Sequence, residues 1–340
     1  MKAMQSGFGR ATQWDVARQA GVSQATVSLV LRGSAAPAIA GETSARVRET
    51  ARALGYAPNR PAQSLRTRRT ETIAVVVPDI GNPFYAALLR GVQSVADRAG
   101  YDVMTMNTDG TAEREQRVLR WSLEGRVDGV VGAFFTLRAT DFRPLTAAGI
   151  AVLRIETSAK ADGSLPIDNL YVDNQAAAAA ATRYLLDRGR RRIAMIAGQG
   201  GPQVERSRGY RLALAERDLA PRLMVDAEFS ENGGYRAASR LLAGGAAPDA
   251  LFAANDLMAI GAMTALRERG LSIPDDVAVI GFDDIFVARL VTPALTTVSQ
   301  FQQHLGEAAA ATLLERLHGA LGPRGTSREM PYRLVERAST

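Results

Sequence analysis

The sequence predicts an α/β protein in two parts: an all-α N-terminal domain, followed by a larger core built on parallel sheets. Three observations carry this prediction. The 340 residues suffice for two or three domains. Short amphipathic segments separated by Gly21 occupy the N-terminal part, and after Thr70 apolar runs alternate with helical patterns. We expect the N-terminal domain at residues 10–59, a linker at 60–70 and the core at 71–340.

The N-terminal domain has the pattern of a helix-turn-helix. Thr12 and Asp15 have the spacing of a capping box, which predicts a first helix over Thr12–Ala20. Gly21 suits the left-handed conformation that ends a helix, and Ser23 can cap a second helix over Gln24–Leu31. The second helix of such a pair enters the DNA major groove. The expected apolar faces are Trp14, Val16, Ala17 and Ala20; Val27, Val30 and Leu31; and, in a third helix from about Glu42 to Leu54, Val47, Ala51 and Leu54.

Basic residues are concentrated in the same region. Residues 1–70 contain eleven Lys and Arg and three Asp and Glu, a net charge of +8, whereas the whole chain carries +6. The other 270 residues therefore carry −2. A basic segment on a nearly neutral body is typical of a nucleic-acid-binding protein, although an Arg-rich surface that only aids solubility gives the same count.

The core repeats one pattern twice. The expected strands are Ile73–Val77, Tyr101–Met106, Val127–Gly132, Arg192–Ala197, Leu251–Ala253 and Val277–Gly281, with helices at Phe84–Ala99 and Asn174–Arg188 among the intervening segments. Two similar α/β halves with a cleft between them are therefore predicted, and ligands of such sheets bind beyond the carboxyl ends of the strands. A last strand is expected within Pro331–Glu336, with no leucine heptads after it.

The composition argues against several other classes of protein. The chain has no cysteine, which excludes disulfides and thiolate zinc sites and fits a reducing cytoplasm. Residues 1–10 lack the apolar segment of a signal peptide, and no run reaches the about 20 apolar residues of a membrane span. His304 and His318 are not at metal-binding spacing, and no Gly-x-Ser-x-Gly motif occurs. We expect a cytoplasmic protein without membrane contact, metal, cofactor or enzymatic activity.

Several motifs resemble those of the lactose/galactose-repressor family of bacterial regulators. They are Asp15-Val16-Ala17, Ala20-Gly21-Val22-Ser23, Ala25-Thr26-Val27-Ser28, Leu54-Gly55-Tyr56-x-Pro58-Asn59 and Ala62-Gln63-Ser64-Leu65-Arg66-Thr67. The resemblance continues to the last strand. It implies a ligand-responsive repressor that binds a palindromic operator as a homodimer, without a tetramerising tail. It also implies a core like that of periplasmic sugar-binding proteins, with one lobe at about 71–170 and 299–325 and the other at about 171–298 with the C-terminal strand.

The same resemblance implies the residues that contact DNA. Base edges would be faced by Gln24, Ala25 and Leu29, and phosphates by Thr12, Ser23, Thr26, Ser28, Tyr56 and Asn59. Arg60–Leu65 is similar to the hinge helix that folds on the operator in this family. Leu65 would enter the minor groove as a wedge, although it can also be a plain linker residue.

Two departures from the family pattern affect the operator. Leu29 stands where relatives often have Arg, so it can offer only apolar contact, for example to a thymine methyl group. Arg32 replaces a common Asn and can add a phosphate or base contact. The loop Gly33–Gly41 is about two residues longer than usual, and Ala40 stands where Ser often caps the third helix. We expect an operator that differs from the commonest family sequence.

The effector site is implied in the cleft. Phe84 and Tyr85 would form an aromatic wall after Asp79, Arg206 would grip a hydroxyl or carboxylate, and Phe229 would stack on the ligand. Asn255, Asp256 and Asp283 match polar contacts, although Asp256 can instead cap a helix and Asp284 can be structural. Such a wall suits a small polar molecule, by default a sugar or related polyol. Gly200 and Pro202 stand where some relatives place polar contacts, so the family's purine site is not reproduced.

Two other classes of function remain as alternatives. A solute-binding protein of a transport system shares the two-lobed body, but it leaves the helix-turn-helix pattern unexplained. A sugar-modifying enzyme would need an acid/base pair or a cofactor motif, and the sequence contains neither in recognisable form.

Overall fold

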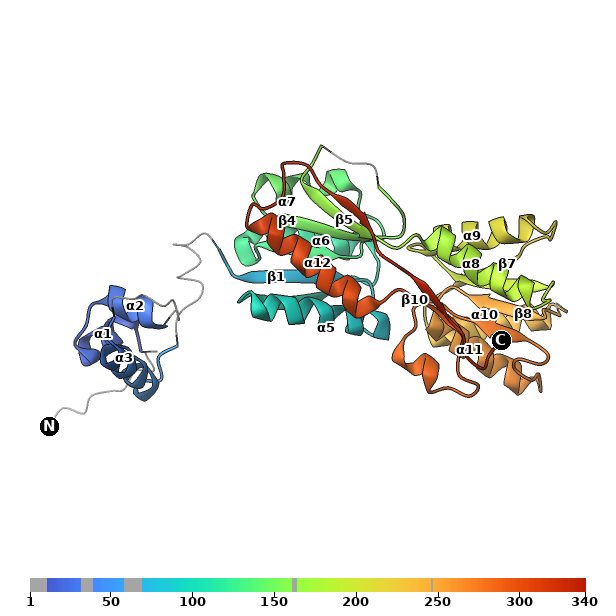
Figure 1. The fold of residues 1–340 in the computed structure, drawn as a ribbon, viewed down its shortest axis with the longest axis horizontal. Coiled ribbons are helices and arrows are strands. Elements are labelled where there is room, and N and C mark those ends of the chain that lie inside the picture. The colour runs from blue at the N-terminus through green and yellow to red at the C-terminus, as the bar shows by residue number, and fades with distance from the viewer. Residues whose placement is uncertain (1–10, 32–38, 58–68, 161–163, 246) are drawn as a thin grey trace. The chain divides into compact units, whose positions relative to one another are not determined.

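The computed structural model describes residues 11–31, 39–57, 69–160, 164–245 and 247–340 (Figure 1). The chain divides into two compact units, Met1–Thr70 and Glu71–Thr340. No helix of the described ranges is both long and apolar enough to cross a membrane. The segment expected to form the hinge helix, Arg60–Leu65, lies outside the described residues.

The N-terminal unit contains α1 (Gln13–Ala20), α2 (Gln24–Leu31) and α3 (Gly41–Ala53). The predicted capping box is present, because Thr12 Oγ1 accepts a hydrogen bond from the Asp15 amide at 3.3 Å and Asp15 Oδ2 accepts one from the Thr12 amide at 2.9 Å. Gly21 ends α1 at a φ of +64°, and Ser23 Oγ accepts from the Thr26 amide at 3.1 Å. The predicted helix-turn-helix is therefore confirmed in its local chemistry.

One valine from each helix forms the centre of this unit. Val16, Val27 and Val47 are fully buried, and each contributes about 1.5–3 kcal/mol by leaving water. The apolar pattern predicted that Trp14 joins this core, and this prediction is wrong. It is 53% exposed, and the Arg18 guanidinium lies 4.6 Å from its ring centroid. The small α1–α2–α3 core is already filled by valine and alanine, which leaves the indole on the surface.

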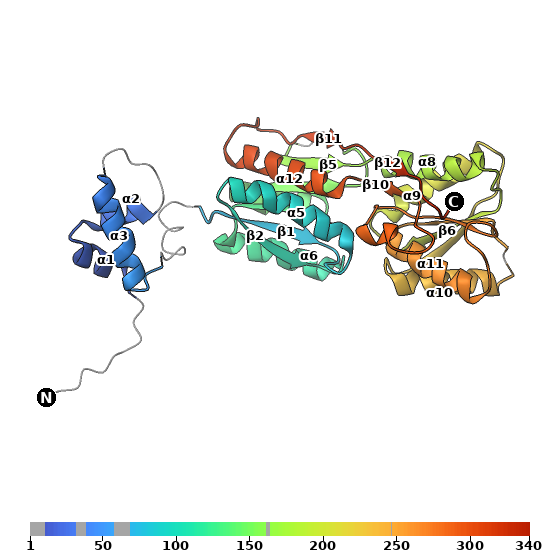
Figure 2. The ribbon, with the colours of Figure 1, turned by 60° about the horizontal axis from the view of Figure 1, so that its bottom comes forward.

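The first lobe of the core is a six-stranded parallel sheet. Its strands are β1 (Thr72–Val77), β2 (Asp102–Asn107), β3 (Gly129–Gly132), β4 (Ala151–Glu156), β5 (Ile167–Tyr171) and β11 (Ser327–Glu329), in the order β11-β5-β4-β3-β1-β2. One face carries α5 (Pro83–Arg98) and α12 (Gln302–Leu317), which lie side by side in Figure 2. The other face carries α6 (Ala112–Trp121) and α7 (Arg143–Ala147). Helices cover both faces, so β3 is buried along its whole length, and β1 and β4 are half-buried only at one end.

The second lobe is a four-stranded parallel sheet. Its strands are β6 (Ile193–Gly198), β7 (Arg222–Ala227), β8 (Ala250–Ala253) and β9 (Ala278–Ile280), in the order β7-β6-β8-β9. The helices α8 (Asn174–Asp187), α9 (Gln203–Ala215), α10 (Glu231–Ala243) and α11 (Asp256–Glu268) pack on it. The close pairs are α8 with α9 and α10 with α11. The two predicted α/β halves are thus confirmed.

The chain passes between the lobes at several points. It leaves the first lobe after β5, returns through β10 (Thr297–Ser299) into α12, and leaves again after β11 through β12 (Arg333–Val335). Antiparallel pairing of β10 with β12 holds two of these crossings together (Figure 2). The pairing of β11 with β5 carries the first lobe to Glu329, beyond the expected limit near residue 325.

Candidate functional site

A cavity of about 1390 Å³ lies where the carboxyl ends of the strands of the two lobes face each other. Pro78 and Asp79 follow β1, the segment 133–137 follows β3, and Glu228 and Phe229 follow β7. Asn255 and Asp283 follow β8 and β9. The cavity therefore lies at the position where ligands of parallel α/β sheets bind.

A buried Arg–carboxylate pair stands on the second-lobe wall. Arg206 of α9 is 4% exposed, and its Nη2 lies 3.4 Å from Asp283 Oδ1. Its Nε donates to Asn174 Oδ1 at 2.7 Å, and its Nη1 donates to the carbonyl of Ala254. The guanidinium carbon lies 3.7 Å from the centroid of the Phe282 ring. These contacts fix the guanidinium, so it presents a preorganised donor to the cavity.

Asp283 is held in an unusual environment. It is 5% exposed, its φ is +111°, and its Oδ1 accepts a hydrogen bond from Gln300 Nε2 at 2.8 Å. Burial raises the pKa of Asp283 to about 6, although Arg206 and Gln300 oppose the shift. Burial also lowers the pKa of Arg206. A strained, desolvated ion pair of this kind is typical of a functional site.

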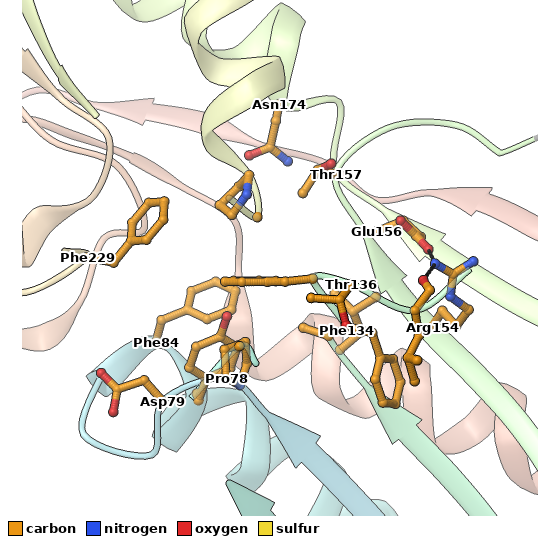
Figure 3. Close-up of a pocket in the computed structure, with 18 of the residues that line it drawn as sticks. Pro78, Asp79, Phe84, Phe134, Thr136, Arg154, Glu156, Thr157, Asn174 and Phe229 are labelled. Carbon is orange, nitrogen blue, oxygen red and sulfur yellow. Dashed lines mark hydrogen bonds and ion pairs between the residues drawn. The ribbon is translucent and has the colours of Figure 1, made fainter. Parts of the chain in front are cut away.

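Aromatic side chains face this pair from both lobes. Phe84 and Tyr85 lie in the first turn of α5, with ring centroids 5.0 Å apart in an edge-to-face arrangement. Asn82 caps that helix by accepting from the Phe84 amide at 3.0 Å. Phe229 approaches from the second lobe (Figure 3). Burial raises the pKa of Tyr85, so its hydroxyl stays protonated and can donate to a ligand.

Two of the expected effector residues have other roles in the structure. Asp256 does not line the cavity: it is fully buried, and its carboxylate accepts from Thr297 Oγ1 at 2.5 Å and from the Ile285 amide at 2.8 Å. Burial raises its pKa well above the usual value. Asn255 lines the cavity, but its Nδ2 donates to the Phe229 carbonyl at 3.1 Å and its Oδ1 caps α11 through the Met258 amide. Asp256 is therefore a structural residue, and Asn255 positions Phe229.

Asp79 and Asp284 are the other two aspartates that the sequence analysis considered for the site. Asp79 is exposed in the loop after β1, and its Oδ1 accepts from the Gly81 amide at 2.8 Å (Figure 3). Asp284 forms an ion pair with Arg337 at 2.6 Å, which supports the structural interpretation of Asp284.

The loop after β3 lines the cavity, and the sequence analysis did not predict this role. Glu115 of α6 is fully buried, and its carboxylate accepts from the amides of Phe135 at 2.6 Å, Thr136 at 3.0 Å and Leu137 at 3.1 Å, and from Thr136 Oγ1 at 2.5 Å. The loop in turn presents Phe135 to the second lobe. A side chain on Gly201 would come within 2.6 Å of Phe135 Cζ, so the lobes touch at this ring.

The strand β4 supplies the other unexpected residues. Arg154 and Glu156 form an ion pair with side chains only 9% and 10% exposed, and both line the cavity (Figure 3). Lys160 Nζ lies 3.5 Å from Glu156 Oε2. A charged residue inside the apolar run Ala151–Ile155 is the signal that could have revealed this pair. Within the described residues no group of three or more acidic or histidine side chains is arranged to hold a metal ion.

The N-terminal unit presents one exposed face of α2. Gln24, Ala25 and Leu29 are exposed, with Leu29 at 41%, while Thr26 and Ser28 are half-buried beside them. Ser23 Oγ lies 2.9 Å from Thr26 Oγ1.

The other residues expected to contact DNA are less uniformly placed. Thr12 is exposed at the start of α1, and Tyr56 is half-buried against the unit's core, where burial raises its pKa. Arg32, Asn59 and Leu65 lie outside the described residues. The structure therefore groups the expected base-facing residues on α2 and leaves those three unplaced.

Comparison with known proteins matches both units. Residues 12–59 match the family model "Bacterial regulatory proteins, lacI family", and residues 182–340 match a periplasmic binding protein-like domain. Catabolite control protein A of Priestia megaterium is 32% identical over 334 residues, covering 97% of this chain and 99% of the relative. The ribose operon repressor of Escherichia coli K12 is 37% identical over 315 residues, covering 90% and 93%. The crystal structure of the lac repressor dimer bound to operator and the anti-inducer ONPF superimposes with a TM-score of 0.85 at 27% identity, covering 97% and 99%.

A helix-turn-helix unit followed by a two-lobed core with a polar cavity defines a class of regulatory proteins that bind small molecules. The chain belongs to the lacI family of bacterial regulatory proteins, since relatives at 32% and 37% identity match nearly its whole length. The resemblance and the fold class predicted from the sequence are thereby confirmed.

Proposed function

We propose that the protein is a transcriptional repressor that binds a palindromic DNA operator as a homodimer and responds to a small polar effector. The observation that carries this proposal is the exposed face of α2 in a chain whose core holds the Arg206–Asp283 cavity. The relatives named as a ribose operon repressor and a lac repressor dimer bound to operator support it. The protein acts in the cytoplasm, where bacterial DNA is, and not as an enzyme.

On DNA, the proposed base-edge contacts come from Gln24, Ala25 and Leu29. Phosphates are contacted by Thr12, Ser23, Thr26, Ser28 and Tyr56, and we extend the proposal to Arg32, Asn59 and the wedge residue Leu65. Leu29 reads an apolar feature such as a thymine methyl group, because it cannot form the bidentate bonds of Arg to guanine. One helix-turn-helix covers too little DNA for high specificity, which is why a dimer on two half-sites is proposed.

In the core, the proposed effector contacts are Asp79, Phe84, Tyr85, Arg206, Phe229 and Asp283, with Asn255 positioning the stacking ring. Aromatic rings cover the apolar faces of a sugar-like molecule while the ion pair fixes its hydroxyls. The effector changes operator affinity only if it binds one arrangement of the lobes better than another.

The test begins with operator selection from genomic fragments, followed by fluorescence anisotropy at several salt concentrations. A palindromic site should be bound by the dimer, with log K falling by about 0.9 per phosphate contact for each unit of log salt. Gln24→Ala should relax specificity at one base pair, with a cost of about 1–3 kcal/mol on the preferred site. Gln19→Ala, an exposed glutamine on α1, is the matched control.

Two results would count against the proposal. Weak binding without sequence preference, even with candidate co-repressors present, would favour the solute-binding alternative. An effector that saturates the core but leaves operator affinity unchanged would contradict the coupling between the two units. Arg206→Met should abolish the effector response while leaving effector-free operator binding intact.

A further inference from the structure

The ring of Phe135 reaches from the first lobe to the second at one edge of the cavity. One side of the ring packs on Gly110 of the first lobe, where an added Cβ would lie 2.8 Å from Phe135 Cδ2. The tip of the ring packs on Gly201 of the second lobe, where an added Cβ would lie 2.6 Å from Phe135 Cζ. All three residues line the cavity. Phe135 is therefore part of the cavity wall and also joins the two lobes at this edge.

The first lobe holds Phe135 in place without help from the second lobe. Glu115 is fully buried in α6, and its carboxylate accepts from three successive amides, those of residues 135–137. Gly110 lies in the loop that leads into the same helix. The helix and its leading loop thus fix both the backbone and the ring of Phe135. Since the side chain is already ordered, little conformational entropy is lost when its tip contacts the second lobe.

The second lobe offers the ring a surface of backbone. Gly200 and Gly201 have positive φ angles of +70° and +56°, a conformation that glycine adopts without strain. A side chain at position 201 would occupy the place of the ring tip. The same loop leads into α9, which begins at Gln203 and carries Arg206. The contact therefore joins the loop before α6 in one lobe to the loop before α9 in the other.

This contact differs from the other links between the lobes. The pairing of β10 with β12 and the hydrogen bond from Gln300 to Asp283 lie where the chain crosses between the lobes. Such crossings can act as a hinge and stay intact when two lobes move apart. Phe135 and Gly201 belong to loops that no crossing connects, so opening of this edge has to break their contact. The part of the half-buried ring that Gly201 covers then returns to water, which is unfavourable.

We infer that Phe135 is a latch between the lobes, and that its contact with Gly201 keeps this edge of the cavity closed when no ligand is bound. The latch adds to the free-energy difference between the closed and open arrangements of the lobes. A ligand that enters by this edge binds only the fraction of molecules in which the contact is broken. Its apparent affinity is reduced by that fraction.

The test measures the distance between the lobes by double electron–electron resonance in the full-length, ligand-free protein. The chain has no cysteine, so Arg117→Cys on α6 and Arg208→Cys on α9 place one spin label on each lobe (Figure 1). Both side chains are exposed, at 65% and 59%, and neither lines the cavity. Labelled chains are assembled with an excess of unlabelled chains, so that the distances measured lie within one chain.

Phe135→Ala should raise the ratio of open to closed lobes by about tenfold, or about 1.4 kcal/mol, seen as a population of longer distances. Gly201→Ala should also open the lobes, because its methyl group meets the ring. In the double variant, Gly201→Ala should add no further opening, because the ring is gone. Phe135→Leu keeps an apolar side chain and should stay close to wild type. Leu123→Ala, an exposed leucine of the first lobe outside the cavity, is the matched control.

Two results would overturn the inference. Superimposable distance distributions for wild type and Phe135→Ala would mean that the crossing segments alone hold the lobes. Additive opening by the two substitutions would mean that Gly201→Ala acts through its own backbone and not through the ring. Thermal melting confirms that each variant folds. Because neither DNA nor a ligand takes part, the outcome does not depend on the proposed function.

Discussion

The buried pair Arg206–Asp283 makes the stability of the core depend on pH in a defined direction. Asp283 has a pKa of about 6 in the folded protein against 3.8 for the free side chain. The folded state therefore binds this proton more tightly than the unfolded state. The stabilisation is fully present below pH 4 and is lost as the pH rises through 6.

Replacing Asp283 by Asn removes this dependence, because the amide does not titrate in this range. One pKa unit corresponds to about 1.4 kcal/mol, so the shift from 3.8 to about 6 corresponds to about 3 kcal/mol. Relative to the Asn variant, the wild type should lose about 3 kcal/mol of stability between pH 4 and pH 7. Asp256 acts in the same direction: burial raises its pKa, and the charge of Asp283 raises it further. Asn tolerates the positive φ at position 283, so the backbone is preserved.

The measurement is urea denaturation of the full-length protein at pH 4 to 7. The chain has two tryptophans, Trp14 in the N-terminal unit and Trp121 at the end of α6. In a Trp14→Phe background, Trp121 fluorescence reports on the core alone. Asp284→Asn is a control on the neighbouring residue, whose partner is Arg337 rather than Arg206. A difference between wild type and Asp283→Asn that stays constant, or that favours the wild type as pH rises, would refute the reasoning. It would mean that Arg206 outweighs burial and keeps the Asp283 carboxylate ionised.

Three further substitutions test the framework around the two sites. Thr12→Ala removes the hydroxyl that accepts from the Asp15 amide and donates to Asp15 Oδ2, and it should destabilise α1 by about 1 kcal/mol, seen as faster amide hydrogen exchange in that helix. Glu115→Gln puts an amide donor against at least one N–H of the loop after β3 and should lower the free energy of unfolding in urea by about 1–3 kcal/mol. Effector binding should also weaken. An unchanged affinity for the effector would mean that this loop is not part of the effector site. Gly201 has a φ of +56° and faces the ring of Phe135. Gly201→Ala should therefore lower the free energy of unfolding by about 1–2 kcal/mol through backbone strain alone. The added methyl group should also push the lobes apart, seen as a larger radius of gyration in solution scattering.

The parts of the molecule that local chemistry determines could be predicted from the sequence. The capping box of Thr12 and Asp15, the helix end at Gly21 and the cap at Ser23 each depend on residues a few positions apart, and the structure contains all of them. The valines at helical spacing gave the core of the N-terminal unit. Motif resemblance placed Arg206 and Asp283, which lie far apart in the chain and meet in the cavity.

Features that depend on distant contacts were missed or wrongly placed. Trp14 fits the helical period, but only packing decides whether the small core has room for an indole. Asp256 stands at a strand end as a ligand contact would, yet Thr297 and Ile285 occupy its carboxylate. The addition of β11 to the first lobe depends on pairing with β5, across more than half of the core's length.

The Arg154–Glu156 pair shows where the limit of prediction lies. The run Ala-Val-Leu-Arg-Ile-Glu at 151–156 was not identified as a strand, because Arg154 and Glu156 interrupt the continuous apolar pattern of a buried parallel strand. Once the strand is known, the pair follows: residues two apart share a face, and a buried guanidinium needs a carboxylate. The two charged residues that interrupt the apolar pattern of the strand are thus the residues that line the cavity. An interruption of this kind is therefore better treated as evidence for a polar site at the strand's carboxyl end than as evidence against the strand.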